Sequence, residues 1–329
     1  VVIVAVVVGG VSLVAFFGYV YCFTCILAGP AFEYTDYVEI VDGSRFQVGQ
    51  KKEAGKPKIP SSTMHALYRL LLGLVCMVLY LVIGGKYPIR RAGTEEFVSS
   101  HGMAARFGFI MIALFGERMK YYFAWKVAEG ASVLGGFGFE GYEEDGVTVK
   151  GWSGAENIDI VGFEAAACLS QLTRAWNKRT QGWLERYTYS RTGNSLIATY
   201  TVSAAWHGFY PGFFLFFLTV PLLTEVERGI RKKINPLFLD ETYNPRESTW
   251  AQFGRLPLKS KIYLLACVVG TMSYINYCVQ VFNILTLEGS LRSWGSFYHF
   301  PHISLVVAYV LLKFMPTPRE KKDGAKKND

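Results

Sequence analysis

Residues 195–224 read SLIATYTVSAAWHGFYPGFFLFFLTVPLLT, and this stretch decides the fold class of the chain. It contains no Asp, Glu, Lys or Arg and exceeds the roughly 20 apolar residues that a helix needs to cross a bilayer. Pro211 and Gly212 interrupt it, so we expect a broken helix, which membrane proteins tolerate where the backbone lines a cavity. Further apolar stretches long enough for spans lie at residues 1–27, 66–85, 263–287 and 297–315. The sequence therefore predicts an all-α, polytopic membrane protein.

The composition of the whole chain agrees with a membrane protein. Hydrophobic residues make up 51% and charged residues 18%, below the roughly 25% usual in soluble domains. The net charge of +8 comes with basic clusters at residues 228–233 and 319–327, which are typical of cytoplasmic loops beside anionic lipid. No basic soluble domain accompanies this charge, so we expect membrane lipids and no nucleic acid among the partners.

The chain is expected to form a single membrane domain over residues 1–315, followed by a basic cytosolic tail over residues 316–329. Its first residue, Val1, lies inside an apolar run with no basic segment before it, so we interpret the N-terminus as truncated. Lys326 and Lys327, fourth and third from the end, resemble the dilysine retrieval signal that a coat complex recognises. This interpretation predicts a multi-pass protein of the endoplasmic reticulum membrane; the alternative is a solvated charged tail.

The remaining segments are more polar. Residues 104–130 have a helical pattern interrupted by charges, which suits a helix lined by protein or water. Residues 135–154 predict a loop, and residues 225–261 predict a charged loop. Residues 162–191 predict an amphipathic helix in the interface or packed across a bundle. Its apolar positions recur at helical spacing: Leu172, Trp176, Thr180, Trp183 and Tyr187.

His207 is the outstanding candidate for chemistry. Residues 195–224 contain no other ionisable side chain of acid or base type. An ionisable group inside a membrane is by default a candidate functional residue. An imidazole has an ordinary pKa of about 6.5, and burial favours its neutral form, which is competent as a base. Ser203 lies one turn earlier, where it can orient the ring, and Gly208 leaves room for a substrate. The alternative is a core histidine bonded to a neighbouring helix.

Asn177 is the second candidate. Its amide can donate to a carbonyl oxygen and stabilise an oxyanion; the alternative is a polar residue on an interfacial helix. His299 and His302 have an H-x-x-H spacing but lack acidic partners. We therefore expect no metal site.

Four blocks of the sequence resemble the membrane-bound O-acyltransferase family, in particular its lysophospholipid acyltransferase branch. They are GPAFEYTDY at 29–37, KYYFAW at 120–125 with EGA at 129–131, WNKRTQGWL at 176–184 and WHGFYPG at 206–212. They follow the family's order, and the last two are the most specific. The resemblance implies a helical bundle with broken, re-entrant and interfacial helices around an internal chamber. It also implies that His207 and Asn177 are the family's two signature polar residues.

The resemblance implies transfer of a fatty acyl group from coenzyme A, a co-substrate, to the free hydroxyl of a lysophospholipid, with no cofactor. His207 would take the hydroxyl proton, and Asn177 would steady the acceptor or the oxyanion. Basic residues of 174–191 would meet the phosphates of coenzyme A, unless they form a solvated or lipid-facing surface. Eight residues would bind substrate or shape the chamber: Tyr121, Tyr122, Trp125, Glu129, Trp176, Thr180, Trp206 and Tyr210. For the four of them on 121–129 the alternative is helix packing, with Glu129 paired to a buried base.

Two other functions remain open at this point. Another branch of the family would acylate a sterol, a diacylglycerol or a protein. A proton-coupled transporter would use His207 in a proton relay, although transporters often contain internal repeats and none is clear here.

Overall fold

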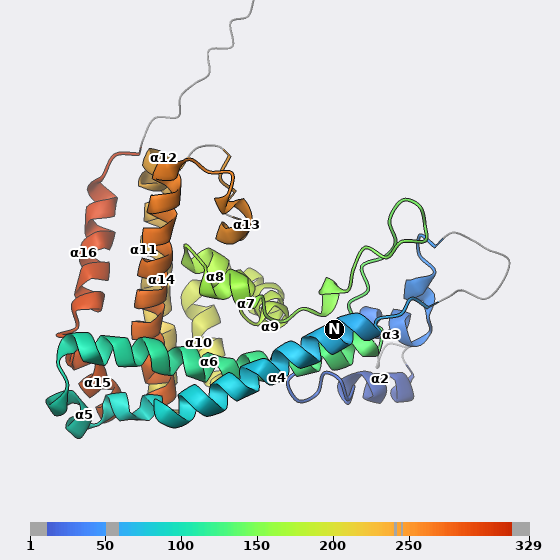
Figure 1. The fold of residues 1–329 in the computed structure, drawn as a ribbon, viewed down its shortest axis with the longest axis horizontal. Coiled ribbons are helices and arrows are strands. Elements are labelled where there is room, and N and C mark those ends of the chain that lie inside the picture. The colour runs from blue at the N-terminus through green and yellow to red at the C-terminus, as the bar shows by residue number, and fades with distance from the viewer. Residues whose placement is uncertain (1–11, 51–58, 240–241, 245, 318–329) are drawn as a thin grey trace, which may run out of the picture. The chain divides into compact units, whose positions relative to one another are not determined.

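The computed structural model describes residues 12–50, 59–239, 242–244 and 246–317 (Figure 1). Regular structure in these residues is helical; the β pairing is limited to an isolated antiparallel bridge between Tyr142 and Val149. The all-α prediction is thereby confirmed. The predicted tail with Lys326 and Lys327 lies outside the described residues, as does the beginning of the predicted first span.

The chain divides into two compact units, each built from three segments. The first comprises Val1–Arg91, Phe107–Phe163 and Thr173–Thr199, and the second comprises Ala92–Arg106, Glu164–Leu172 and Tyr200–Asp329. The expected single domain over residues 1–315 stays a prediction.

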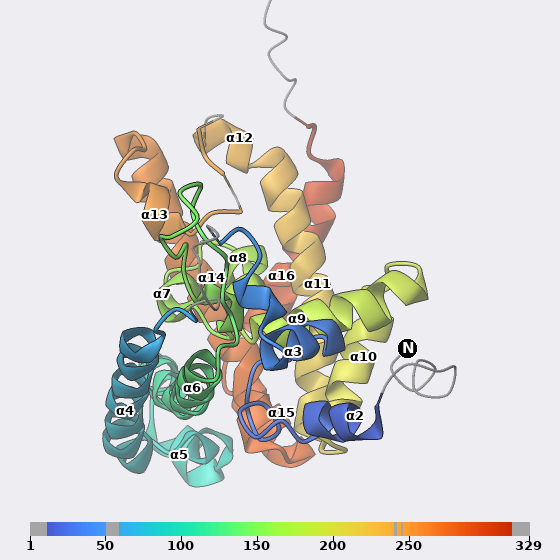
Figure 2. The same ribbon diagram turned by 90° about the vertical axis from the view of Figure 1, so that its right-hand side faces the viewer.

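The first unit is organised around two long helices, α4 (Thr63–Lys86) and α6 (Met103–Leu134). They lie side by side (Figures 1 and 2) and run antiparallel, because Gly130 approaches Ala66 near one end and Gly116 approaches Ile83 near the other. A β-carbon built at Gly116 would lie 2.7 Å from Ile83 Cγ2, so the small residue permits this close packing. The unit also contains α2 (Leu13–Val20), α3 (Tyr34–Val41), α9 (Lys178–Leu184), a π-helix (Glu185–Tyr189) and 3-10 turns at Ser44–Phe46, Ser153–Ala155 and Ser190–Thr192.

The predicted loop at residues 135–154 is confirmed, and it folds back as an irregular hairpin. Glu143 N donates to Thr148 O at 2.7 Å, and Glu140 N donates to Gly151 O at 3.1 Å. The hairpin is held by a cluster of buried residues that includes Phe46, Phe139, Tyr142 and Trp152. Aromatic packing thus gives this Gly-rich loop a defined conformation.

The second unit is a bundle in which α11 (Pro211–Lys233) packs against both α14 (Leu258–Ile284) and α16 (Phe300–Phe314) (Figure 1). Lys233 Nζ donates to Met315 O at 2.5 Å, which ties the C-terminal ends of α11 and α16 together. The shorter helices are α5 (Glu95–Ser100), α12 (Asn235–Phe238), α13 (Thr249–Phe253) and α15 (Leu287–Gly295). Because α11 continues to Lys233 and α12 and α13 follow, the predicted continuous charged loop at 225–261 was wrong.

Two described helical segments, Thr63–Gly93 and Leu258–Ile284, are long and apolar enough to cross a membrane. These correspond to the spans predicted at 66–85 and 263–287. The pair α15 and α16 bends by 71° and supplies a third crossing if it acts as one span. The predicted interruption of 195–224 is confirmed, because α10 (Leu196–His207) ends before Gly208 and α11 begins at Pro211.

Candidate functional site

His207 is the last residue of α10, and one backbone contact fixes its ring. Its Nδ1 lies 2.6 Å from Ser203 O, one turn earlier. A carbonyl oxygen can only accept, so Nδ1 carries the proton, and in the neutral imidazole Nε2 keeps its lone pair. The sequence correctly places Ser203 as the orienting residue, but its backbone oxygen performs this role. No described residue hydrogen-bonds to Nε2.

Three phenylalanine rings surround the imidazole. The ring centroids of Phe213, Phe217 and Phe282 lie 5.9, 5.0 and 5.2 Å from that of His207. The residue is nevertheless exposed among the described residues, so they do not provide the burial expected from the sequence. The predicted substrate-binding residues Trp206 and Tyr210 are each 57% exposed. A basic nitrogen therefore lies beside exposed aromatic surface.

The break between α10 and α11 follows from the residues at 208–212. Gly208 has φ +125°, a conformation that residues with a β-carbon rarely adopt. Pro211 occupies the first turn of α11, where its missing N–H costs nothing. Gly212 N donates to Leu285 O at 3.0 Å, and a β-carbon at Gly212 would lie 2.1 Å from Val281 O. This contact fixes the beginning of α11, and with it Phe213, against α14.

Asn177 lies at a bend immediately before α9, as its N-cap residue, and not inside a helix. The continuous amphipathic helix predicted over 162–191 was wrong: α7 (Ile160–Glu164), α8 (Leu169–Ala175) and α9 are separate. Ala175 O, which a continuous helix would bond to residue 179, accepts from Asp159 N at 3.0 Å. Arg179 N donates to Asn157 Oδ1 at 3.3 Å. Two residues of an earlier segment, Asp159 and Asn157, thus bond the two backbone groups that a continuous helix would join.

The backbone of Asn177 is left-handed, with φ 45° and ψ 49°. Asparagine adopts this region more readily than other non-glycine residues, which suits the residue to the turn. Its side chain is half-buried and makes no hydrogen bond to any described residue. The amide is therefore available to a ligand.

An aromatic cluster brings four of the predicted binding residues together in the first unit. The Trp176 ring centroid lies 5.7 Å from that of Tyr121, 6.0 Å from Tyr122 and 4.8 Å from Trp125. Phe163 joins them at 4.8 Å from Trp176; sequence reasoning missed it, because only the fold brings α7 to this position. Tyr122 is 0% exposed and packs within the protein. Thr180 is half-buried on α9, three residues after Asn177.

Glu129 is also 0% exposed, and Lys126 Nζ donates to its Oε2 at 2.7 Å. This arrangement corresponds to the alternative of a carboxylate paired to a buried base. The other carboxylate oxygen of Glu129, Oε1, accepts hydrogen bonds from the backbone N–H groups of Asn157 and Ile158, at 2.7 and 3.0 Å. Asn157 is a further residue that the sequence did not identify, because its role depends on contacts with distant segments.

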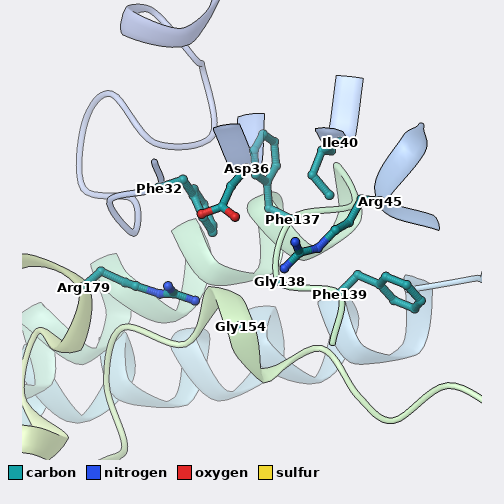
Figure 3. A pocket seen from close by; sticks show the side chains of 9 residues that line it. All are labelled: Phe32, Asp36, Ile40, Arg45, Phe137, Gly138, Phe139, Gly154 and Arg179. Carbon is teal, nitrogen blue, oxygen red and sulfur yellow. The ribbon is translucent and has the colours of Figure 1, made fainter. Parts of the chain in front are cut away.

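A pocket of about 80 Å³ lies in the first unit and is lined in part by Arg179, two residues after Asn177 (Figure 3). Arg179 and Arg45 reach it from opposite sides, and Asp36 points into it. The Arg179 guanidinium lies 5.5 Å from the Phe32 ring centroid. Burial lowers the pKa of Arg179, while the Asp36 carboxylate acts to raise it. The other lining residues are Ile40, Phe137, Gly138, Phe139 and Gly154.

Asn177 belongs to the first compact unit and His207 to the second. Within its own unit, each presents a polar atom free of protein partners among the described residues. An imidazole nitrogen can accept a proton, and an amide can donate to a developing oxyanion.

Comparison with known proteins gives consistent matches. A model described as the membrane-bound O-acyltransferase family matches residues 5–251. A lysophospholipid acyltransferase of Schizosaccharomyces pombe is 32% identical over 322 residues, covering 95% of this chain and 60% of the relative. Lysophospholipid acyltransferase 1 of Arabidopsis thaliana is 31% identical over 327 residues, covering 94% and 66%.

Membrane-bound glycerophospholipid O-acyltransferase 2 of Homo sapiens is 30% identical over 318 residues, covering 94% of this chain and 58% of the relative. The chain thus spans less than two thirds of the length of these relatives.

Proposed function

The chain belongs to the membrane-bound O-acyltransferase family, and we propose that it is an acyl-CoA-dependent enzyme that acylates the free hydroxyl of a lysophospholipid. Three similar proteins are named lysophospholipid or glycerophospholipid acyltransferases, which supports this acceptor class. The exposed aromatic side chains of Trp206, Phe209 and Tyr210 beside His207 suit a lipid acceptor, because they offer apolar contact near the reacting atom.

The observation that carries the proposal is the orientation of His207. Ser203 O holds Nδ1, so Nε2 is the atom that receives the proton of the acceptor hydroxyl. The hydroxyl oxygen attacks the thioester carbonyl, the C–S bond breaks, and the coenzyme A thiolate takes the proton from His207. No covalent enzyme intermediate is needed, because the thioester is already activated.

Asn177 supplies the second group in this proposal. Its unoccupied amide donates to the oxygen that becomes negative as the tetrahedral intermediate forms. Trp176, Tyr121 and Trp125 would hold the turn and contact the acyl chain, and Thr180 would lie beside the same ligand. Donors prepared in advance are effective because they need no reorganisation when charge develops.

We assign the phosphates of coenzyme A to the cationic residues of 174–191. Lys178 and Arg186 already pair with Glu156 and Glu33, at 2.5 Å in each case. Arg179 makes no side-chain hydrogen bond to a described residue and points into the pocket of Figure 3. It is therefore the cation of this segment best placed to meet an added anion.

The proposed location is the membrane of the endoplasmic reticulum. Two described helices are long and apolar enough to cross a bilayer, which supports a membrane location. The assignment to the endoplasmic reticulum, with recognition of Lys326 and Lys327 by a coat complex, is part of this proposal.

An acceptor screen tests the activity. Membranes containing the intact protein are given radiolabelled acyl-CoA with lysophospholipids, a sterol, a diacylglycerol or a peptide. We expect labelled phospholipid, and His207→Ala should reduce turnover by about 10²–10⁴, the usual contribution of a general base. His65→Ala is the matched control, because His65 is exposed and makes no described side-chain hydrogen bond. Full turnover by folded His207→Ala would refute the catalytic role, and label only in another acceptor would refute the substrate class.

A further inference from the structure

Three charged side chains of α4 and α6 hold one segment, residues 152–158, which begins with the 3-10 turn Ser153–Ala155. Glu129 Oε1 accepts from Asn157 N and Ile158 N, at 2.7 and 3.0 Å. Lys126 Nζ donates to Ile158 O at 2.7 Å, and Arg69 donates to Trp152 O at 3.0 Å. Because hydrogen bonds to charged groups are stronger than neutral ones, these contacts fix the backbone of the segment to the two helices.

The held segment in turn binds both sides of the Asn177 turn. Asp159 N donates to Ala175 O at 3.0 Å, before the turn. After it, Lys178 N donates to Asn157 O at 2.8 Å, and Arg179 N donates to Asn157 Oδ1 at 3.3 Å. A continuous set of hydrogen bonds therefore runs from Glu129 through Asn157 to the residues that flank Asn177.

We propose that Glu129 is a positioning residue, which fixes the Asn177 amide in its reactive orientation through Asn157. This inference rests on the proposed role of Asn177 and explains how the left-handed turn is kept in place. It also gives the charged triad of Glu129, Lys126 and half-buried Arg69 a function in the reaction that requires no contact with the acyl group.

The geometry argues against Glu129 as a substrate contact. The residue is 0% exposed, Oε1 is used by two backbone N–H groups, and Oε2 is used by Lys126 Nζ. Arg69 Nε lies 3.7 Å from Oε2, so a second cation faces the same oxygen. Both carboxylate oxygens thus face protein donors.

Glu129→Gln tests the proposal with little change in volume. The amide oxygen of the glutamine can still accept hydrogen bonds from the two backbone N–H groups. The amide nitrogen then faces the Lys126 amino group, and because both groups are donors, that hydrogen bond is lost. We expect kcat to fall by roughly 100-fold, since a misplacement of about 1 Å has this effect, while KM for both substrates changes little. Glu117→Gln is the matched control, because Glu117 pairs with Lys120 at the same i,i+3 spacing on the same helix.

Hydrogen exchange measured by mass spectrometry gives a readout independent of activity. In Glu129→Gln, peptides containing Asn157–Ile158 and Lys178–Arg179 should exchange faster, although they are distant in sequence. Peptides of the 140–151 hairpin, whose Glu140 N–H bonds Gly151 O, should keep wild-type protection. A merely structural Glu129 would instead speed exchange throughout the first unit, and that result would overturn the proposal.

A double variant separates failure of this inference from failure of the proposed function. If Asn177→Gly keeps full turnover, the role of Asn177 in the reaction is wrong, whatever Glu129 does. If Asn177→Gly is slow, adding Glu129→Gln should cause no further loss, since both act through one amide. The positioning role would be refuted if the two losses of turnover multiply in the double variant. It would also be refuted if Glu129→Gln keeps wild-type kcat and wild-type protection from hydrogen exchange.

Discussion

The left-handed backbone of Asn177 determines how its role must be tested. Replacement by alanine changes two things, because alanine lacks the amide and also disfavours φ 45°. Glycine removes the amide and accepts this backbone freely. Aspartate keeps the shape and the tolerance of the left-handed region, but its ionised side chain cannot donate. Comparing the three substitutions therefore separates the contribution of the side-chain amide from that of the left-handed backbone conformation.

The expected magnitudes differ for the two effects. Loss of one oxyanion donor reduces kcat by about 10²–10³. A non-glycine residue held in the left-handed region costs on the order of 1 kcal/mol, which lowers the melting temperature by roughly 2–4 °C in a unit of this size. We expect Asn177→Gly and Asn177→Asp to lose activity at a wild-type melting temperature, while Asn177→Ala loses both.

The assay compares kcat at saturating acyl-CoA and lysophospholipid in membranes, normalised to the amount of protein. Melting is followed on the same detergent-extracted samples. Wild-type turnover by Asn177→Gly would show that the residue serves only the turn. Turnover by Asn177→Asp would show that donation by the amide is not required. Either result would refute the oxyanion assignment.

Two further substitutions test how the second unit is held together. Gly212→Ala places a β-carbon 2.1 Å from Val281 O, so α11 must move away from α14, and both turnover and melting temperature should fall. Gly270→Ala, with nothing within 4 Å, is the control that should leave both unchanged; equal melting temperatures would contradict the packing argument. Gln280→Leu removes the acceptor that lies 2.5 Å from the buried Ser293 Oγ, at a cost of about 1–3 kcal/mol measured by thermal melting. The double variant Gln280→Leu with Ser293→Ala should recover part of this loss, and no recovery would show that the hydroxyl was not the cause.

The parts of the fold that the sequence predicts well depend on local composition. The spans at 66–85 and 263–287 follow from long apolar stretches in which Arg69 is the one charged residue, and the break after His207 follows from Pro211 and Gly212. Each of these signals acts within a few residues of the chain. The position of Ser203 one turn before His207 was likewise readable from helical spacing.

Other features depend on contacts between distant segments, and here the pattern misled. The apolar residues of 162–191 recur at helical spacing, yet Ala175 O bonds Asp159 N instead of residue 179. The apolar run around His207 predicts burial, but the described residues leave it exposed. Hydrophobic periodicity indicates which side chains are kept from water. It does not indicate which partners hydrogen-bond to the backbone groups.

A polar group in an apolar segment suggests either structure or chemistry, and hydrogen-bond satisfaction distinguishes the two. Glu129 and Lys126 lie on the charge-bearing helix α6, and the carboxylate oxygens of Glu129 and the amino group of Lys126 are hydrogen-bonded to each other or to backbone groups. One ring nitrogen of His207 hydrogen-bonds to its own helix, and the other forms no hydrogen bond to a described residue. Asn177 uses its backbone for the turn and leaves its side chain unbonded. His207 is exposed and Asn177 is half-buried among the described residues, so a substrate can reach the free nitrogen and the free amide beside the neighbouring apolar side chains. By this criterion Glu129 acts through position, and His207 and Asn177 act on the substrate itself.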